Sequence, residues 1–261
     1  TQIRKPTPNK IEATFRMKII TYNVNGIRSA ITKGLLTWVQ STNAEVVCLQ
    51  EIKASSDQID QAAFKELGYT TYAFPAQKKG YSGVAIFTKE IPKHVEYGCG
   101  IEKYDFEGRV IRADYSDFSV MNVYMPSGSS GEERQIFKYG WMDDFLIYVT
   151  KLQKSIPNLI VCGDFNICHQ AIDIHNPKSN ANTSGFLPEE RAWMTKLFDS
   201  GFIDGFRHFN KEPHNYTWWS YRAGSRGKNL GWRIDYHIIT KNMESRLKRS
   251  VILPDAIHSD H

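Results

Sequence analysis

The sequence predicts an α/β protein in which two mixed β-sheets pack face to face, with helices on their outer sides. Apolar runs typical of buried strands alternate along the chain with helical patterns, and no period typical of a repeat protein connects them. Some strands follow one another at hairpin distance, whereas others are separated by a helix. Because hairpins give antiparallel pairs and helical crossovers give parallel ones, this arrangement favours mixed sheets.

The predicted strands occupy the apolar runs, in chain order, at residues 17–24, 45–51, 82–89, 109–115, 119–126, 158–165 and 233–240. Helical periodicity predicts helices at residues 33–42, 56–67, 132–152 and 188–198. In the last of these, Pro188 suits a first helical position and Gly201 a stop. No linker rich in Pro, Gly or Ser divides the chain, so we expect residues 17–261 to form a single domain.

Residues 1–16 are polar and contain two prolines, and we expect a disordered tail or a leader there. With 41% hydrophobic residues, the 261-residue chain can bury a sizeable core. Its formal net charge of +5 permits a polyanionic partner without identifying one. No apolar stretch reaches the about 18 residues that a membrane-spanning helix requires, so we expect no membrane partner. The cysteines form no C-x-x-C pair, and we expect reduced core thiols at Cys48, Cys99, Cys162 and Cys168.

Polar side chains recur where the apolar runs end. One such side chain alone is read best as part of an ordinary turn, but the pattern repeats at five or six ends: Asn23, Asn25, Glu51, Asp164, Asn166, Asp235, Asp260 and His261. Residues at positions i and i+2 of an extended chain point to the same face, so a carboxylate and an amide can converge on one ligand. Carboxylate and amide oxygens suit Mg²⁺ or Mn²⁺, whereas Zn²⁺ favours His and Cys. The pattern therefore indicates metal-assisted phosphate chemistry.

Nine motifs in this order resemble the exonuclease III family of abasic-site DNA repair endonucleases, within the endonuclease/exonuclease/phosphatase superfamily: "NVNG", "LQEIK", "GYSGVAIFTK", "EGRVIRADY", "NVYMPSGSS", "CGDFNICH", "GFLPEER", "GWRIDYH" and "SDH". The resemblance runs from Met17 to His261 and implies a four-layer α/β sandwich with one catalytic domain. It implies a Mg²⁺-dependent phosphodiesterase, with Mn²⁺ as a substitute, that cuts 5′ to an abasic site and leaves a 3′-hydroxyl. The implied partner is double-stranded DNA with abasic sites or blocked 3′ ends, trimmed by 3′-exonuclease or 3′-phosphatase activity.

The resemblance also implies a monomer in the bacterial cytoplasm, associated with the nucleoid, or in a eukaryotic nucleus. It assigns Glu51, Asn25 and Asp260 to the metal. Asp164 is expected to orient or deprotonate the attacking water, and Asn166 to position that water and the phosphate. Asp235 is expected to fix His261, whose charged form stabilises phosphoryl oxygens, and Tyr124 to donate its hydroxyl to the phosphate.

The remaining implied residues bind substrate. Asn23 is expected to organise hydrogen bonds in the site. Trp218, Trp232 and Ile234 read as core from the residues alone, whereas the resemblance makes them a pocket for a flipped-out sugar without its base. Arg222, Arg226 and Lys228 are expected to grip phosphates without reading sequence.

Two other functional classes fit the residues. One is a phosphatase or phosphodiesterase for a small molecule or lipid, which would lack a tryptophan-lined pocket and a basic DNA track. The other is a catalytically weak DNA-binding module, favoured if metal fails to bind despite Glu51.

Overall fold

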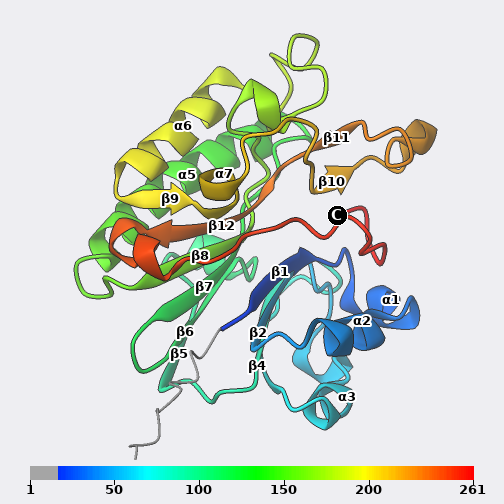
Figure 1. Ribbon diagram of the computed structural model, residues 1–261, viewed down its shortest axis with the longest axis vertical. Helices are drawn as coiled ribbons and strands as arrows, with labels where there is room; N and C mark the ends of the chain where they lie inside the picture. Colours follow the sequence, from blue (N-terminus) through cyan, green and yellow to red (C-terminus); the bar gives the residue numbers. More distant parts are fainter. Residues whose placement is uncertain (1–16) are drawn as a thin grey trace, which may run out of the picture.

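The computed structural model describes residues 17–261, which form two large β-sheets facing each other between layers of helices (Figure 1). The predicted four-layer α/β sandwich is confirmed. The expected tail or leader at residues 1–16 lies outside the described residues.

The first sheet has four strands, in the spatial order β1 (Ile19–Asn23), β2 (Val46–Gln50), β4 (Val84–Thr88) and β3 (Thr70–Phe74). β1 and β2 are parallel, and the other two pairs are antiparallel. Three helices cover the outer face, namely α1 (Ile27–Thr32), α2 (Leu35–Thr42) and α3 (Gln61–Glu66). Leu35, Val39 and Phe64 from these helices pack with Val47 and Phe87 of the sheet into one buried cluster.

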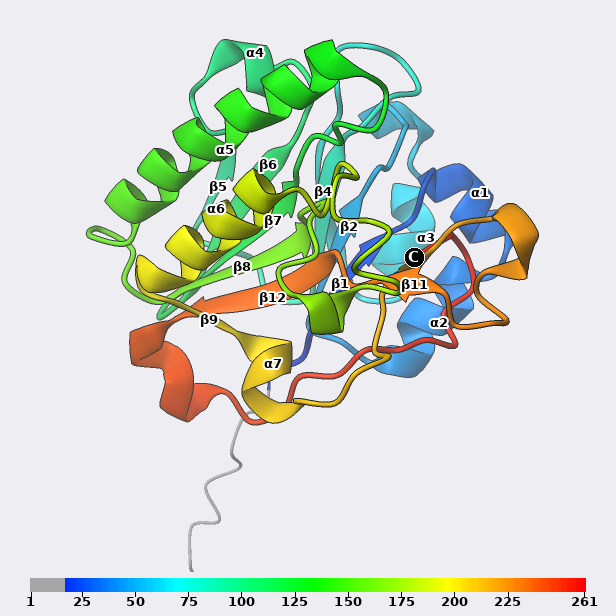
Figure 2. The ribbon, with the colours of Figure 1, turned by 90° about the horizontal axis from the view of Figure 1, so that it is seen from above.

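The second sheet has six strands, in the order β5 (His94–Tyr97), β6 (Val110–Asp114), β7 (Ser119–Tyr124), β8 (Leu159–Asp164), β12 (Asp235–Thr240) and β9 (Phe202–Asp204). Only β7 and β8 are parallel within this sheet. Figure 2 shows the helices α5 (Glu132–Leu152) and α6 (Pro188–Asp199) across its outer face. Short helices α4 (Glu102–Asp105) and α7 (Gly205–Phe209) flank it.

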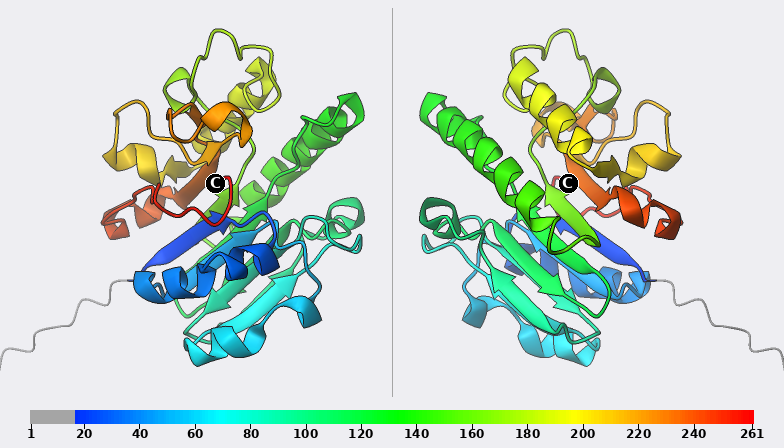
Figure 3. Two further views of the ribbon diagram at one scale, coloured as in Figure 1. Left: turned by 90° about the vertical axis from the view of Figure 1, so that its right-hand side faces the viewer. Right: turned by 90° about the vertical axis from the view of Figure 1, so that its left-hand side faces the viewer.

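Figure 3 shows the two sheets packed against each other. The side chains between them form the central layer of the core. Most are apolar, including Val46 and Ile86 from the first sheet and Ile111 and Val120 from the second. One buried amide pair joins the sheets, because Gln50 Nε2 donates to Asn122 Oδ1 at 2.7 Å. Asn122 Nδ2 in turn donates to the carbonyls of Leu49 and Ala85, whereas Gln50 Oε1 accepts no hydrogen bond from the described residues.

Long helices form where the sequence repeats apolar residues at helical spacing. α5 spans residues 132–152 as predicted, begins with Glu132 and Glu133 and buries Trp141, Phe145 and Val149 at steps of four residues. The single helix predicted at residues 56–67 is wrong. It is a 3-10 turn at Ser56–Gln58 followed by α3, because the Asp60 carboxylate accepts a hydrogen bond from the Ala63 amide and starts a new helix.

The elements that sequence patterns did not predict are short or lie at sheet edges. They are α1, α4, α7, β3, β5, β9 and the two-stranded antiparallel sheet of β10 (Trp218–Trp219) and β11 (Gly231–Trp232). Short 3-10 segments occur at Ala171–Asp173, Arg222–Gly224 and Lys241–Arg246. None of the helices described within residues 17–261 has both the length and the apolar character needed to cross a membrane.

Candidate active site

The polar strand ends predicted from the sequence meet at one edge of the two sheets. The register pairs Asn23 at the end of β1 with Gln50 at the end of β2, directly before Glu51. In the second sheet, Asp164 at the end of β8 pairs with Tyr124 on one side and with Asp235 on the other. The C-terminal segment passes between β1 and the β10–β11 sheet, so Asp260 and His261 reach the same edge (Figure 1).

Asn23 connects the carboxylates of the two sheets. Its side chain is fully buried, and Nδ2 donates to Glu51 Oε1 and to Asp164 Oδ2, each at 2.9 Å. Its Oδ1 accepts from the Asn25 amide at 3.0 Å. One amide thereby uses both donor hydrogens to hold two acids that come from different sheets. This is the placement expected of a residue that organises the site.

The three side chains predicted to bind the metal, those of Glu51, Asn25 and Asp260, lie close together. Glu51 Oε2 lies 2.8 Å from the ammonium of Lys53, which also donates to Asn25 Oδ1. Asn25 Nδ2 donates to Asp260 Oδ1 at 2.9 Å, and Trp218 Nε1 donates to Asp260 Oδ2 at 3.0 Å. Glu51 and Asn25 therefore both contact the ammonium group of Lys53. Their carboxylate and amide oxygens are the donors that a hard divalent cation prefers.

The charge on Glu51 is favoured even though the residue is largely buried. Burial raises the pKa of its carboxyl group, but the positive charge of Lys53 and hydrogen bonds from Asn23 and Lys53 outweigh burial and lower the pKa below its ordinary value. An ionised Glu51 is the state that a cation requires.

A second acidic group lies on the other side of Asn23. Asp164, Asp235 and His261 have ligand atoms within 4.8 Å of one another, which also makes this group able to hold a metal ion. His261 Nδ1 donates to Asp235 Oδ2 at 2.8 Å, and His261 Nε2 lies 3.8 Å from Asp164 Oδ2. The sequence resemblance assigns the metal to Glu51, Asn25 and Asp260. The structure thus contains two neighbouring acidic groups, one around Glu51 and one around Asp164.

The protonation states of Asp164 and His261 depend on burial and on the charges of the neighbouring residues. Burial raises the pKa of Asp164, the charge of Asp235 raises it further, and the pKa is about 7. Burial lowers the pKa of His261, but Asp235, Asp164 and Asp260 outweigh it and raise the pKa to about 10. His261 is therefore a buried cation, and Asp164 is a carboxylate that can take up a proton near neutral pH.

The backbone after β8 aims the Asp164 carboxylate. Gly163 has a φ of 141°, and a Cβ at this position would lie 1.9 Å from the Val123 carbonyl oxygen, so only glycine fits between β7 and β8. Asn166 adopts left-handed backbone geometry, with its amide nitrogen donating to Asp164 Oδ1 at 2.8 Å. Its Nδ2 donates to the Met125 carbonyl at 2.9 Å. Asp164 and Asn166 thus lie together, as expected.

Tyr124 lies between these acids at the end of β7. Burial, then the negative charge of Glu51, raises the pKa of its hydroxyl well above the ordinary value, although Arg109 opposes the shift. The hydroxyl therefore stays protonated and can donate a hydrogen bond.

The aromatic residues form a small apolar cluster beside the acids. Trp218 and Trp232 pair across β10 and β11 and meet edge to face, with ring centroids 5.8 Å apart. Both rings are partly exposed and pack on a buried base formed by Cys168, Ile174, Phe186 and Ile234. Trp218 also reaches Asp260, so this cluster adjoins the acidic side chains directly.

The family match spans nearly all of the described chain. Residues 20–261 match the model of the Endonuclease/Exonuclease/phosphatase family. This protein belongs to that family.

Individual relatives are similar over most of this chain. An exodeoxyribonuclease of Bacillus subtilis is 41% identical over 247 residues, covering 94% of this chain and 96% of the relative. A DNA repair nuclease of Danio rerio is 40% identical over 248 residues, covering 94% of this chain and 80% of the relative. The structure of an AP endonuclease from Archaeoglobus fulgidus aligns with a TM-score of 0.79 at 30% identity, covering 90% of this chain and 95% of that one.

The three basic residues that were predicted to contact DNA phosphates differ in their exposure and in their contacts within the protein. Arg222 and Lys228 are exposed on the loop between β10 and β11. That Arg226 grips phosphate stays a prediction. In the structure its guanidinium lies 4.5 Å from the Trp219 ring and donates to the carbonyls of Ser259 and Ala256, each at 2.9 Å, so Arg226 also holds the segment that leads to Asp260.

Three charged residues at the site were missed by the sequence reasoning. Lys53 lies in the "LQEIK" motif but was assigned no role. Lys138 and Glu190 lie inside helical patterns, where charged residues usually face solvent. Only the apolar neighbours of Lys138 at helical spacing, Trp141 and Met142, hinted that its side chain points inward.

Proposed function

We propose that this protein is a Mg²⁺-dependent DNA repair phosphodiesterase that cleaves 5′ to abasic sites and leaves a 3′-hydroxyl. Mn²⁺ substitutes for Mg²⁺, and trimming of 3′ ends accompanies the main activity. The observation that carries the proposal is the convergence of Glu51, Asn23 and Asp164 directly beside the cluster of Trp218 and Trp232. The names of the relatives, an exodeoxyribonuclease and an AP endonuclease among them, support it.

The residues divide the chemistry between them. Asp164 orients the attacking water and accepts its proton, and Asn166 fixes the Asp164 carboxylate through its backbone amide. The His261 cation faces the charge that develops on the phosphoryl oxygens, and the protonated Tyr124 hydroxyl donates to the phosphate. Glu51, with Asn25 and Asp260, holds Mg²⁺, which when bound offsets negative charge on the phosphate.

The tryptophan cluster supports DNA over a small-molecule substrate. An abasic nucleotide has lost its pairing and stacking, so it leaves the duplex at low cost. Trp218 and Trp232 offer apolar walls for the bare sugar, and the exposed Arg222 and Lys228 lie on the adjoining loop, where they can contact the phosphate backbone.

The test is cleavage of three duplexes, one with a single abasic analogue, one undamaged and one nicked, each with and without Mg²⁺. We expect Mg²⁺-dependent cleavage of the abasic duplex, slower trimming at the nick, and neither in an Asp164→Asn variant that still binds abasic DNA. Hydrolysis of phosphate esters of small molecules or lipids without abasic cleavage would overturn the proposal in favour of the small-molecule class. Metal-independent DNA binding without turnover would identify a binding module.

A further inference from the structure

A fully buried ion pair lies behind the site. Lys138 of α5 and Glu190 in the first turn of α6 both have side chains with no exposed surface, and Lys138 Nζ lies 2.6 Å from Glu190 Oε1. Removing two charges from water is unfavourable, and an apolar pair of similar volume is often as stable. A contribution to stability is therefore a weak explanation for burying this ion pair. The other hydrogen bonds of Lys138 and Glu190 show which parts of the chain the pair holds in place.

Lys138 holds the residue that aims Asp164. Its Nζ donates to the Asn166 carbonyl oxygen at 2.9 Å. Asn166 has a φ of 51°, in the left-handed region that asparagine adopts more readily than most residues, and its amide donates to Asp164 Oδ1. The buried cation thus fixes one end of a peptide segment whose other end orients the carboxylate.

Glu190 holds the loop behind Trp232. Its Oε2 accepts from the amides of Gly185 at 2.6 Å and Leu187 at 3.0 Å. Gly185 has a φ of 96°, and a Cβ there would lie 2.8 Å from Trp232 Cζ3, so the loop backbone lies directly against the indole. The Gly185 carbonyl also accepts from the Cys168 amide at 2.8 Å, which joins this loop to the segment after Asn166.

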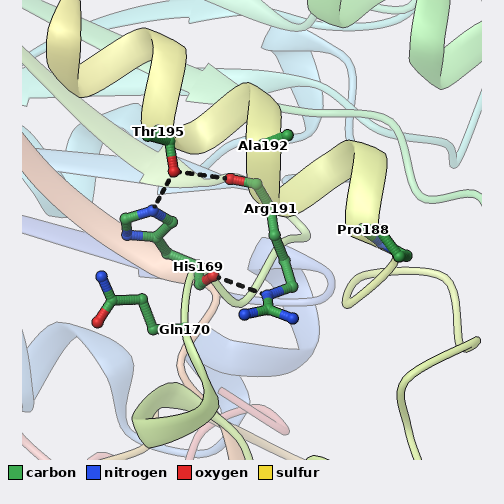
Figure 4. A pocket seen from close by; sticks show the side chains of 6 residues that line it. All are labelled: His169, Gln170, Pro188, Arg191, Ala192 and Thr195. Atoms are coloured by element: carbon green, nitrogen blue, oxygen red, sulfur yellow. Dashed lines mark hydrogen bonds between the residues drawn. The ribbon is translucent and has the colours of Figure 1, made fainter.

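The first two turns of α6 also contact the segment after β8. Figure 4 shows Arg191, beside Glu190 in sequence, donating from Nε to the His169 carbonyl at 3.1 Å. His169 itself meets Thr195 of α6 at 2.9 Å. The chain after β8 is therefore held by Lys138 of α5 and by Arg191 and Thr195 of α6.

We propose that the Lys138–Glu190 pair is a positioning device that ties the water-activating group to the wall of the sugar pocket. Lys138 sets the orientation of Asp164 through Asn166, and Glu190 sets the position of Trp232 through Gly185. The pair acts through these neighbours without touching substrate. The assignment of Asp164 and Trp232 to turnover and damage recognition rests on the proposed function.

Two double variants separate the roles and leave no charge stranded. Lys138→Met/Glu190→Gln loses the donor to Asn166 but keeps an oxygen for the Gly185 and Leu187 amides. We expect kcat to fall about 10- to 100-fold on abasic and 3′-end substrates alike, the range for supporting contacts around a site, with their ratio preserved. Lys138→Met/Glu190→Ala also loses the acceptor, and we expect it to lose the preference for abasic sites as well.

Controls distinguish positioning from general destabilisation. Val149→Ala lies in the same helix, is equally buried and should lower stability without changing kcat or the substrate ratio. Gly185→Ala keeps the ion pair and crowds Trp232, so it should lower abasic cleavage more than 3′-end trimming. If the double variants do not fold, Gly185→Ala still tests whether the position of Trp232 affects the preference for abasic sites.

Hydrogen exchange of the Gly185 and Leu187 amides gives a readout that needs no activity. We expect slow exchange in the parent and in Lys138→Met/Glu190→Gln, and fast exchange in Lys138→Met/Glu190→Ala. Parental kcat in both double variants, or equal exchange at these amides in all of them, would overturn the inference. An inactive parent with the expected exchange pattern would instead overturn the proposed function alone.

Discussion

Replacing Asp235 with asparagine separates the charge of this residue from its shape. An amide oxygen can still accept the hydrogen bond that His261 Nδ1 donates over 2.8 Å, so the imidazole keeps its orientation. The substitution removes the negative charge, which contributes most among the groups that raise the pKa of His261. A change in the activity of the Asp235→Asn variant therefore reports the loss of the negative charge and not a change in the orientation of His261.

We expect both limbs of the pH–activity profile to move to lower pH. The His261 cation is present below its pKa and is lost as pH rises through it, so the alkaline limb should move from about 10 towards the ordinary value of about 6.5. Asp235 also raises the pKa of Asp164, second to burial. The Asp164 carboxylate is present above its pKa of about 7, so without Asp235 the acidic limb should move below that value.

The size of the effect follows from the protonated fraction of His261. If its pKa falls to about 6.5, only about 3% is charged at pH 8, which predicts a loss in kcat of about 30-fold there. At pH 6 the loss through His261 is less than about twofold, and the larger fraction of Asp164 carboxylate opposes it. The assay is kcat against pH on a duplex with a base-stable abasic analogue. The charge argument fails if Asp235→Asn lowers kcat by the same factor at both pH values. As a control, Asp235→Asn should not move the alkaline limb further in a His261→Gln background.

Three further substitutions test other parts of the site. Glu51→Gln should raise the Mg²⁺ concentration needed for half-maximal cleavage, because it removes the anionic oxygen that now faces Lys53, and an unchanged requirement would contradict its role as a ligand. Trp232→Ala should reduce abasic cleavage several-fold to about a hundredfold more than 3′-end trimming, given about 1–3 kcal/mol for stacking on an aromatic wall, and an unchanged ratio in a folded variant would show that Trp232 is only core. Arg226→Met should lower Tm because it removes two hydrogen bonds to backbone carbonyls, and we expect the salt dependence of DNA binding to stay unaltered, whereas a slope of log Kd against log salt reduced by about one would confirm Arg226 as a phosphate contact.

Sequence patterns predicted the parts of the fold in which burial repeats along the chain. α5 was predicted with its full length because its apolar residues recur at helical spacing over many turns, and β2 because all five of its residues are buried. β3 and β5 lie at sheet edges and have largely exposed or half-buried side chains. Their apolar signal is weak for that reason, and pairing with β4 and β6 supplies what the local sequence lacks.

The site was predictable where strands carry residues to a common edge. Asn23, Glu51 and Asp164 follow apolar runs, so their convergence follows from the sheets. The contacts of Arg226 were not predictable, since its acceptors at Ala256 and Ser259 lie about 30 residues away on an irregular segment. Lys138 presents the same difficulty, because whether a helical lysine faces water or an acid depends on the helix packed against it.

The bonds from Asn23 to acids of both sheets also determine when activity can arise during folding. Asn23 and Asp164 are separated by 141 residues, and their hydrogen bond spans the interface between the sheets. Closing so long a loop is entropically costly and is a slow kind of folding event. A chain refolding from denaturant should regain the secondary structure of each sheet before it regains any nuclease activity, because the acids come into alignment only when the two halves dock.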